Sequence, residues 1–235
     1  MHDYVDFLRH KLAKARTGKK TARTELQIEI AAATLLGTKA YHSISVDMIA
    51  EQAGLAHGTV YRYFGGKRDV VAKTLTDYFE FVRATRPAIP EPASDLEAIE
   101  IANLHYVLCF RQNVGLMRCH FHLKDEDEMI AQVGREADKS MSERVIRRLR
   151  RRRIEITDDQ LPELRLRTYC LISMVDELLL KIYGRNNPPL AEFADDPAMV
   201  AATVSRLWHA ALYSDVPAGL TSAPAAIDPL AATAR

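Results

Sequence analysis

The sequence predicts an all-α protein with a helix-turn-helix near its N-terminus, and three observations lead to this prediction. Strand-like alternation is scarce in the 235 residues, whereas apolar residues recur at helical spacing. The segment AGLAHGTVYRYFGGKRD, residues 53–69, places a glycine turn between two short helical patterns. Basic residues are concentrated early: residues 1–86 carry 14 Lys and Arg against 9 Asp and Glu, a net of +5, and residues 87–235 carry 18 against 22, a net of −4. This distribution indicates a local anionic partner.

Composition excludes several classes of protein. Hydrophobic residues make up 48% and charged residues 27%, as in ordinary globular proteins. The three cysteines, Cys109, Cys119 and Cys170, form no Cys-x-x-Cys pair, so a disulfide framework is excluded and a reducing compartment is favoured. The longest apolar run, CLISMV, is far shorter than the ~20 residues of a membrane span, and the N-terminus has no apolar signal region. We therefore expect a cytoplasmic protein that does not contact a membrane.

Helix start and stop signals follow one another in the basic region. TELQ forms a capping box, which predicts that the first core helix begins near Thr24. Ser45 is a good N-cap for a second helix, VDMIAEQA, and Gly54 stands where a left-handed C-terminal cap is needed. HGTVYRYF then predicts a second short helix after a tight turn. Helix, glycine turn and short helix together make a helix-turn-helix.

The short helix carries more polar side chains than burial requires. If Val60 and Phe64 face inward, the remaining side chains project outward as donors that suit phosphates and base edges of DNA. Lys67 opens the next helix, where its charge and the free backbone N–H groups predict a phosphate site. The alternative is an ordinary helical pair with exposed aromatic residues. The residues that we expect to contact DNA are Ser45, His57, Gly58, Thr59, Tyr61, Arg62, Tyr63 and Lys67.

The stretch TELQIEIAAATLLGTKAYHSISVDMIAEQAGLAHGTVYRYFGGKRDVVAKTL resembles the DNA-binding domain of the tetracycline-repressor (TetR) family. The resemblance covers about residues 22–76 and is most specific in IAEQAGLAHGTVYRYF followed by Lys. Ala56 departs from the family pattern, which commonly has a capping Ser or Thr there, and GGK replaces the frequent Pro-Ser-Lys. His57 stands at a position that resembles a base-reading one.

The resemblance implies an N-terminal three-helix DNA-binding domain and a C-terminal helical domain for ligand binding and dimerisation. We expect a basic arm at 1–21, a helix-turn-helix domain at 22–68, an effector-binding and dimerisation domain at 69–214 and a flexible tail at 215–235. The implied function is a ligand-responsive regulator, foremost a repressor released from a palindromic operator by a small, mainly apolar molecule. The alternative is a constitutive or architectural DNA-binding protein without an effector. The basic arm either contacts DNA or is a solvated, partly helical tail.

The later helices contain polar groups among apolar stretches, as an effector cavity would. At helical spacing the same residues serve equally well as plain core. The candidates for the cavity are His105, Cys109, Arg118, Phe121, His122, Tyr169, Met174 and Glu177.

The segment CHFH raises the possibility of a metal site. Cys119 and His122 share a helix face at i,i+3, whereas His120 points elsewhere, and no second pair completes four tetrahedral ligands. We therefore expect no metal and no cofactor. We also expect no enzyme, because the chain has no G-x-S-x-G elbow, no G-x-G-x-x-G and no P-loop.

The helix that begins near Glu163 is apolar on two sides, so it needs more than one partner. One line of mainly apolar residues, or seam, recurs at steps of 4,3,4,3,4 from Leu164 to Ile182. The last helix has a similar apolar seam. Pairing both helices with their symmetry mates predicts a homodimer with a four-helix interface. Which seam faces the partner stays open. The candidate interface residues are Leu171, Val175, Leu178, Val204, Leu207 and Ala211.

Overall fold

The computed structural model describes residues 2–15, 19–152, 156–185 and 187–213, and within these ranges the chain is helical without strands. The elements are α1 (Tyr4–Lys14), α2 (Lys20–Thr38), the 3-10 turn η2 (Tyr41–Ser43), α3 (Val46–Ala53), α4 (His57–Tyr61), α5 (Lys67–Ala84), α6 (Asp95–Gln112), α7 (Val114–Leu123), α8 (Glu128–Arg151), α9 (Leu161–Leu179), the π turn η3 (Leu180–Gly184), the 3-10 turn η4 (Pro188–Phe193) and α10 (Pro197–Tyr213). The predicted all-α fold is confirmed. None of the described helices is both long enough and apolar enough to cross a membrane.

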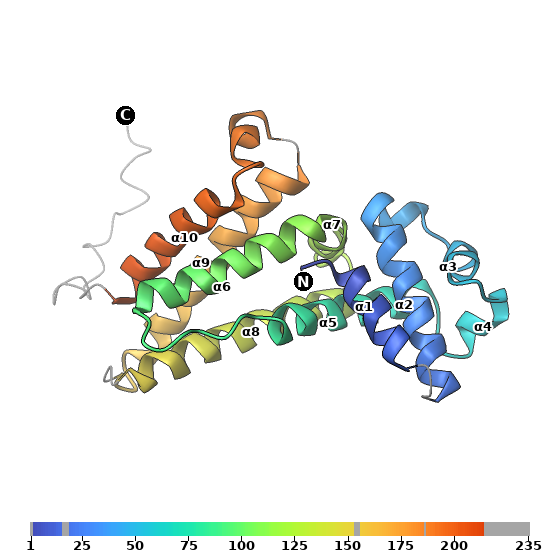
Figure 1. Cartoon of the computed structure of the whole chain (residues 1–235), viewed down its shortest axis with the longest axis horizontal. Coiled ribbons are helices and arrows are strands. Elements are labelled where there is room, and N and C mark those ends of the chain that lie inside the picture. Colours follow the sequence, from blue (N-terminus) through green and yellow to red (C-terminus); the bar gives the residue numbers. More distant parts are fainter. Residues whose placement is uncertain (1, 16–18, 153–155, 186, 214–235) are drawn as a thin grey trace, which may run out of the picture.

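The helices form two units that share α5 (Figure 1). The N-terminal unit consists of α1 to α4 and the first turns of α5, and the C-terminal unit consists of the rest of α5 and α6 to α10. In the C-terminal unit α6 packs along α10, with Asn103 Nδ2 donating to Ser205 Oγ across the contact at 3.0 Å. The helix α5 is therefore a continuous connection between the two units.

Two of the three predicted helix ends in the N-terminal unit are confirmed. Ser45 Oγ accepts from the Met48 N–H at 3.2 Å, and Gly54 ends α3 in the left-handed conformation at φ 67°. The capping box at Thr24 is wrong. The helix α2 begins one turn earlier, and the buried Thr24 hydroxyl donates to the Lys20 carbonyl at 3.0 Å. Inside a helix this back-bond replaces the cap that Thr24 would provide at an end.

The segment predicted as a basic arm contains a packed helix, α1. Tyr4 and Leu8 are buried, and the α1 helix lies against α2. The Tyr4 hydroxyl donates to the buried Glu29 carboxyl group, and the Tyr4 N–H donates to Asn113 Oδ1 at 2.9 Å. Asn113 stands between α6 and α7, so α1 ties the N-terminal unit to the C-terminal unit.

The two units meet where α7 crosses α2, and the crossing depends on Gly115. A Cβ atom at position 115 would lie 2.6 Å from the Gly37 Cα atom and closer still to the Leu36 carbonyl oxygen. Backbone cannot yield as a flexible side chain would, so only glycine allows this approach.

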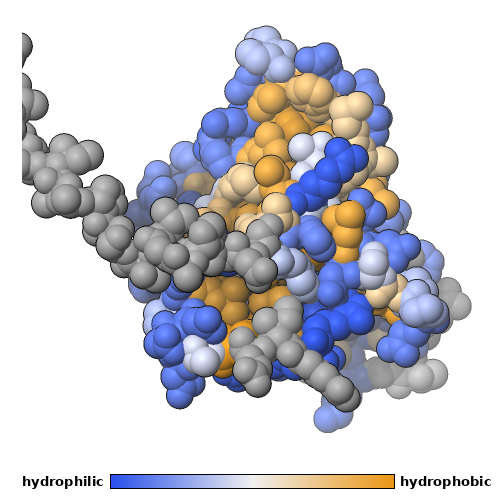
Figure 2. Space-filling model, turned by 90° about the vertical axis from the view of Figure 1, so that its left-hand side faces the viewer, coloured by the Kyte–Doolittle hydropathy of each residue, from blue (hydrophilic) through white to orange (hydrophobic). Residues whose placement is uncertain are grey.

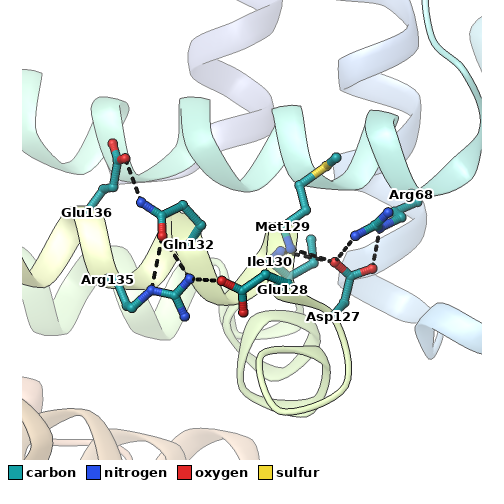
Figure 3. A network of polar contacts seen from close by, with 8 residues as sticks. All are labelled: Arg68, Asp127, Glu128, Met129, Ile130, Gln132, Arg135 and Glu136. Carbon is teal, nitrogen blue, oxygen red and sulfur yellow. Dashed lines mark hydrogen bonds and ion pairs between the residues drawn. The ribbon is translucent and has the colours of Figure 1, made fainter.

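A second contact between the units joins the start of α5 to the start of α8 (Figure 3). Arg68 donates from Nε to Asp127 Oδ2 at 2.5 Å and from Nη2 to Asp127 Oδ1 at 2.8 Å. Asp127 also accepts from the backbone N–H groups of Met129 and Ile130, as the N-cap of α8. The Arg68 guanidinium lowers the pKa of this carboxyl group, so it stays ionised as a cap and as an ion-pair partner.

Candidate nucleic-acid interface and effector cavity

The short helix α4 stands on a single buried anchor, Val60, which is fully inaccessible to solvent. Around it Tyr61 is 50% exposed, and His57, Gly58 and Arg62 are also exposed. Thr59 and Tyr63 are half-buried, as is Phe64, which was expected to face inward. The helix therefore presents most of the predicted contact residues to solvent on a rigid support. No side chain caps its N-terminus, where Ala56 stands, as the sequence predicts.

Side-chain contacts hold the exposed residues of α4 against one another and against α3. His57 Nδ1 pairs with the Asp47 carboxylate, which joins α4 to α3, and the rings of His57 and Tyr61 lie 5.1 Å apart. Arg62 Nη2 donates to Thr59 Oγ1 at 3.4 Å. Asp47 is a site residue that the sequence analysis missed, because an exposed acid is not expected in a surface for an anionic partner.

Lys67 has a different position from the one expected of a phosphate ligand. Its Nζ donates to the Tyr41 carbonyl at 3.2 Å and to the Ile44 carbonyl at 2.8 Å, and it lies 4.1 Å from the centroid of the Tyr41 ring. Two of its three donors are thus used within the fold. Lys67 links the start of α5 to the loop before α3.

Residues 30–74 match a profile described as "Bacterial regulatory proteins, tetR family". This range holds the whole helix-turn-helix. This part of the chain is thus similar to the bacterial regulatory proteins of the tetR family. Together with the exposed surface of α4, this match makes the helix-turn-helix the candidate DNA-binding surface.

Several known proteins are similar to this chain at low sequence identity. The fatty acid metabolism regulator protein of Bacillus subtilis (strain 168) is 32% identical over 77 residues, which is 32% of this chain and 40% of that protein. The chain thus matches about 40% of that relative's length. A transcriptional regulator from Rhodococcus sp. Rha1 is 16% identical at a TM-score of 0.65 over 79% of this chain and 95% of that one. The regulator FadR from Bacillus subtilis in complex with stearoyl-CoA is 19% identical at a TM-score of 0.57 over 76% of this chain and 98% of that one.

A large open cavity of about 1390 Å³ lies in the C-terminal unit, between α5 and α8 and against α6, α7 and α9. Much of its lining is apolar. The aromatic and aliphatic residues that contribute most clearly are Phe79, Tyr106, Met117, Phe121, Ile172 and Val175.

Charged and titratable groups also line the cavity, and among them Asp176, Asp138 and His120 have pKa values that burial shifts. Burial raises the pKa of Asp176 to about 7, and Tyr106 Oη donates to Asp176 Oδ1 at 2.6 Å. Burial also raises the pKa of Asp138. Burial lowers the pKa of His120 to about 4, so its imidazole is neutral near pH 7, and its Nδ1 has no hydrogen-bond partner. A buried polar atom without a hydrogen bond destabilises the folded protein, unless water or a ligand supplies that hydrogen bond.

The His120 ring reaches this position because Gly134 has no side chain. A Cβ atom there would lie 2.6 Å from His120 Cε1 and 2.7 Å from Nε2. The ring also meets Phe79 edge to face, with the centroids 5.3 Å apart.

A second cavity of about 950 Å³ adjoins the first and is rich in arginine. Arg86 and Arg144 line both cavities, and no carboxylate of the described residues forms an ion pair with either. The Nε of Arg86 is buried without a partner, and burial lowers its pKa to about 10, with repulsion from Arg144 adding to the effect. Arg148 and Arg152, farther along α8, pair with Asp95. The junction between the cavities thus holds two arginines without an ion-pair partner among the described residues.

Only two of the eight predicted effector residues line the large cavity. Phe121 and Glu177 line the large cavity. The other six lie outside its lining: His105, Cys109, Arg118, His122, Tyr169 and Met174. His105 is packed in the core, where its Nε2–H donates to the Val82 carbonyl at 2.9 Å. Arg118, His122 and Tyr169 are exposed.

The assignment of faces on α7 is corrected, because His120 points inward and His122 outward. Arg86, Asp138 and Asp176 also line the cavity but were not predicted from the sequence. Asp176 had a signal, as a charged residue within the apolar stretch CLISMVDELLL, whereas Arg86 and Asp138 lie outside apolar stretches and had none.

Three of the six predicted interface residues are buried within the single chain: Leu171, Val175 and Val204. Leu178 and Ala211 are half-buried, and Leu207 is 48% exposed. The regular seam of α9 is therefore its intrachain face.

The exposed apolar residues of α9 and α10 lie elsewhere on these helices. Leu166 is 64% exposed and Tyr169 38% on α9, and Met199 is 51% exposed on α10. Figure 2 shows the end of the molecule that these helices help to form, where a hydrophobic band lies between hydrophilic residues. These faces have no intrachain partner in the described part of the chain.

Proposed function

We propose that this protein is a transcriptional repressor that binds a palindromic operator as a homodimer and is released by an anionic amphipathic molecule. One observation carries the choice of ligand: Arg86, whose buried Nε has no partner and whose guanidinium forms no ion pair among the described residues, lies at the junction of the large cavity and the arginine-rich one. A buried cation without a counter-charge favours an anion that arrives with a ligand.

The proposal of a homodimer starts from the size of α4. A five-residue helix offers few base contacts, so two copies on half-sites one helical turn apart, about 34–36 Å, supply useful specificity. The exposed apolar faces of α9 and α10, with Leu166, Tyr169, Met199 and Leu207, support isologous pairing at the end remote from α4.

The size and lining of the cavity favour a ligand with a long apolar part. About 1390 Å³ exceeds the range of roughly 300–1,000 Å³ that is usual for small-molecule sites, and Phe79, Met117 and Ile172 supply apolar walls. The anionic part would then reach Arg86 and Arg144. The FadR structure with stearoyl-CoA, a molecule of this chemical class, supports the choice as a first probe.

The path from the ligand to DNA runs along α5 and α8, which border the cavity and meet again at Arg68 and Asp127. A ligand that separates α5 from α8 would disturb this pair and alter the position of the N-terminal unit. Release then requires that the ligand binds one arrangement of the two units more tightly than the other.

Operator binding measured by fluorescence anisotropy, with and without acyl-CoA, tests the proposal. We expect stearoyl-CoA to release the wild-type protein, and Arg86→Gln to require at least roughly tenfold more ligand, since a charged hydrogen bond contributes about 1.5–3 kcal/mol. Arg150→Gln is the matched control, because Arg150 is an exposed arginine of α8 that lines neither cavity. Stearate, tested in parallel, distinguishes a carboxylate head from the phosphates of CoA.

Two outcomes of these binding measurements would contradict the proposal. Operator affinity that no anionic amphiphile changes would favour the constitutive DNA-binding alternative. Equal ligand sensitivity of wild-type protein and Arg86→Gln would exclude the role given to the arginine junction.

A further inference from the structure

Three exposed side chains converge at the boundary between the two units. His42 lies in the η2 turn of the N-terminal unit, His122 lies in the last turn of α7, and Glu126 follows in the turn before α8. One ligand atom from each lies within 4.8 Å of the others. The two histidines are 80 positions apart in the sequence and are brought together only by the packing of the units.

The distance between the imidazoles fits a shared metal ion. His42 Nε2 and His122 Nε2 are 3.3 Å apart, and the rings are perpendicular with centroids at 5.4 Å. A tetrahedral zinc ion with bonds of 2.0–2.1 Å places two nitrogen ligands about 3.3–3.4 Å apart. The nitrogen pair, which can share a hydrogen bond in the absence of an ion, therefore already has the spacing of two metal ligands.

The surroundings also suit a cation. Glu126 belongs to the run Lys124, Asp125, Glu126, Asp127 and Glu128, which has a net charge of −3. Of these acids, Asp127 is engaged by Arg68 and Glu128 by Arg135 (Figure 3), whereas Glu126 lies beside the two histidines. Two imidazole nitrogens and one carboxylate are a ligand set typical of zinc, and they leave a fourth position for water.

We propose that His42, His122 and Glu126 form a divalent transition-metal site, of the zinc class, that bridges the N-terminal and C-terminal units. One ligand comes from the N-terminal unit and two from the C-terminal unit, so a bound ion cross-links them. It would hold the units in the arrangement seen here, next to the Gly115 crossing and the Arg68–Asp127 pair. Metal binding at this place does not depend on the effector or on the operator.

The test uses the untagged full-length protein, with Zn²⁺ titrated by calorimetry and Co²⁺ followed by its visible absorption. We expect one ion per chain in the wild-type protein. Removal of either imidazole, in His42→Gln or His122→Gln, should weaken binding by at least roughly tenfold, and Glu126→Gln should weaken it less. All three residues are exposed, so the variants should fold as the wild-type protein does, which circular dichroism checks.

Two control variants separate this site from adventitious surface binding. His10→Gln removes an exposed histidine on α1, and Cys170→Ser removes the exposed thiol on α9. Both should bind the ion as tightly as the wild-type protein. Zn²⁺ should also raise the Tm of the wild-type protein but not that of His42→Gln.

Absence of stoichiometric binding, or equal affinity of the wild-type protein and the His42→Gln/His122→Gln double variant, would overturn the proposal. Loss of affinity in His122→Gln but not in His42→Gln would also overturn it, because the ion would then not bridge the units.

Discussion

The N-terminal and C-terminal units differ in whether their polar side chains have hydrogen-bond partners. In the N-terminal unit the Tyr4 hydroxyl donates to the Glu29 carboxyl group, the Thr24 hydroxyl donates to one backbone carbonyl, and the Lys67 ammonium group donates to two. The unpartnered buried side-chain atoms found in the described residues all lie in the C-terminal unit, on Arg86, His120, Ser142, Arg148, Tyr183 and Trp208. The polar groups named above in the N-terminal unit have hydrogen-bond partners within the fold. The C-terminal unit contains buried polar atoms without a partner, to which a ligand could form hydrogen bonds.

The largest expected effect is the difference in stability between substitutions on the buried face and on the exposed face of α9. Leu171→Glu places a charge in the core of one chain, where Leu171 is 6% exposed, and we expect it to unfold the protein, at a cost above about 4 kcal/mol. Leu166→Glu, at a position 64% exposed, should leave the fold intact but yield a monomer in light scattering and abolish operator binding. A folded Leu171→Glu protein or a dimeric Leu166→Glu protein would contradict this division of the faces.

A smaller effect is expected where the two units touch. Gly115→Ala forces α7 away from α2, and we expect a loss of about 3 kcal/mol in urea unfolding, at the upper end of ordinary overpacking. Gly37→Ala, on the other side of the same crossing, has open space around the added methyl group and should stabilise α2 by up to about 1 kcal/mol. Similar unfolding midpoints for the two variants would show that the crossing is looser than described.

The pH dependence of stability should reveal the cavity carboxyl group Asp176. Its pKa rises from 3.8 in a solvated group to about 7 in the folded protein, so the folded state holds the extra proton between these values. Its contribution to stability is full below about pH 4 and is lost as the pH rises to 7. Asp176→Asn should therefore stabilise the protein at pH 8, by on the order of 2 kcal/mol because the open cavity admits water, and not at pH 4. Thermal melts across this range test the prediction, and a constant difference between the two proteins would contradict it.

The smallest effect concerns Lys67 and distinguishes a structural contact from a DNA contact. Lys67→Gln should lower the free energy of unfolding by about 1 kcal/mol, because two carbonyls lose a charged donor. Arg62→Gln should leave stability unchanged and weaken operator binding, since Arg62 is exposed and bonds only to Thr59 among the described contacts. A stable Lys67→Gln protein with weakened DNA binding would restore the phosphate role that the sequence predicts.

Local signals in the sequence were sufficient for the fold and for the helix-turn-helix. Ser45, Gly54 and the missing cap at Ala56 are decided by residues within one turn, and the structure confirms all three. Thr24 failed because a cap signal does not exclude an earlier start, and the helix gains a further turn by beginning at Lys20.

The site residues in the C-terminal unit were harder to predict, because periodicity shows which residues share a face but not where that face points. The helix α7 has only 10 residues and is apolar on both sides, so His120 and His122 could be exchanged without violating any pattern. The same ambiguity on α9 left open which seam faces a partner, and the structure buries Leu171 and Val175 of the regular seam within the chain. The meeting of His42 and His122 depends on tertiary packing alone and has no local signal.

The contact between Gly134 and His120 constrains the order in which this protein can evolve. Any side chain at position 134 collides with the rigid imidazole ring while residue 120 remains histidine. A lineage that replaces His120 with a smaller residue first can later accept alanine or serine at position 134, whereas the reverse order passes through a damaged intermediate. The two positions are therefore expected to change in that order, residue 120 before residue 134.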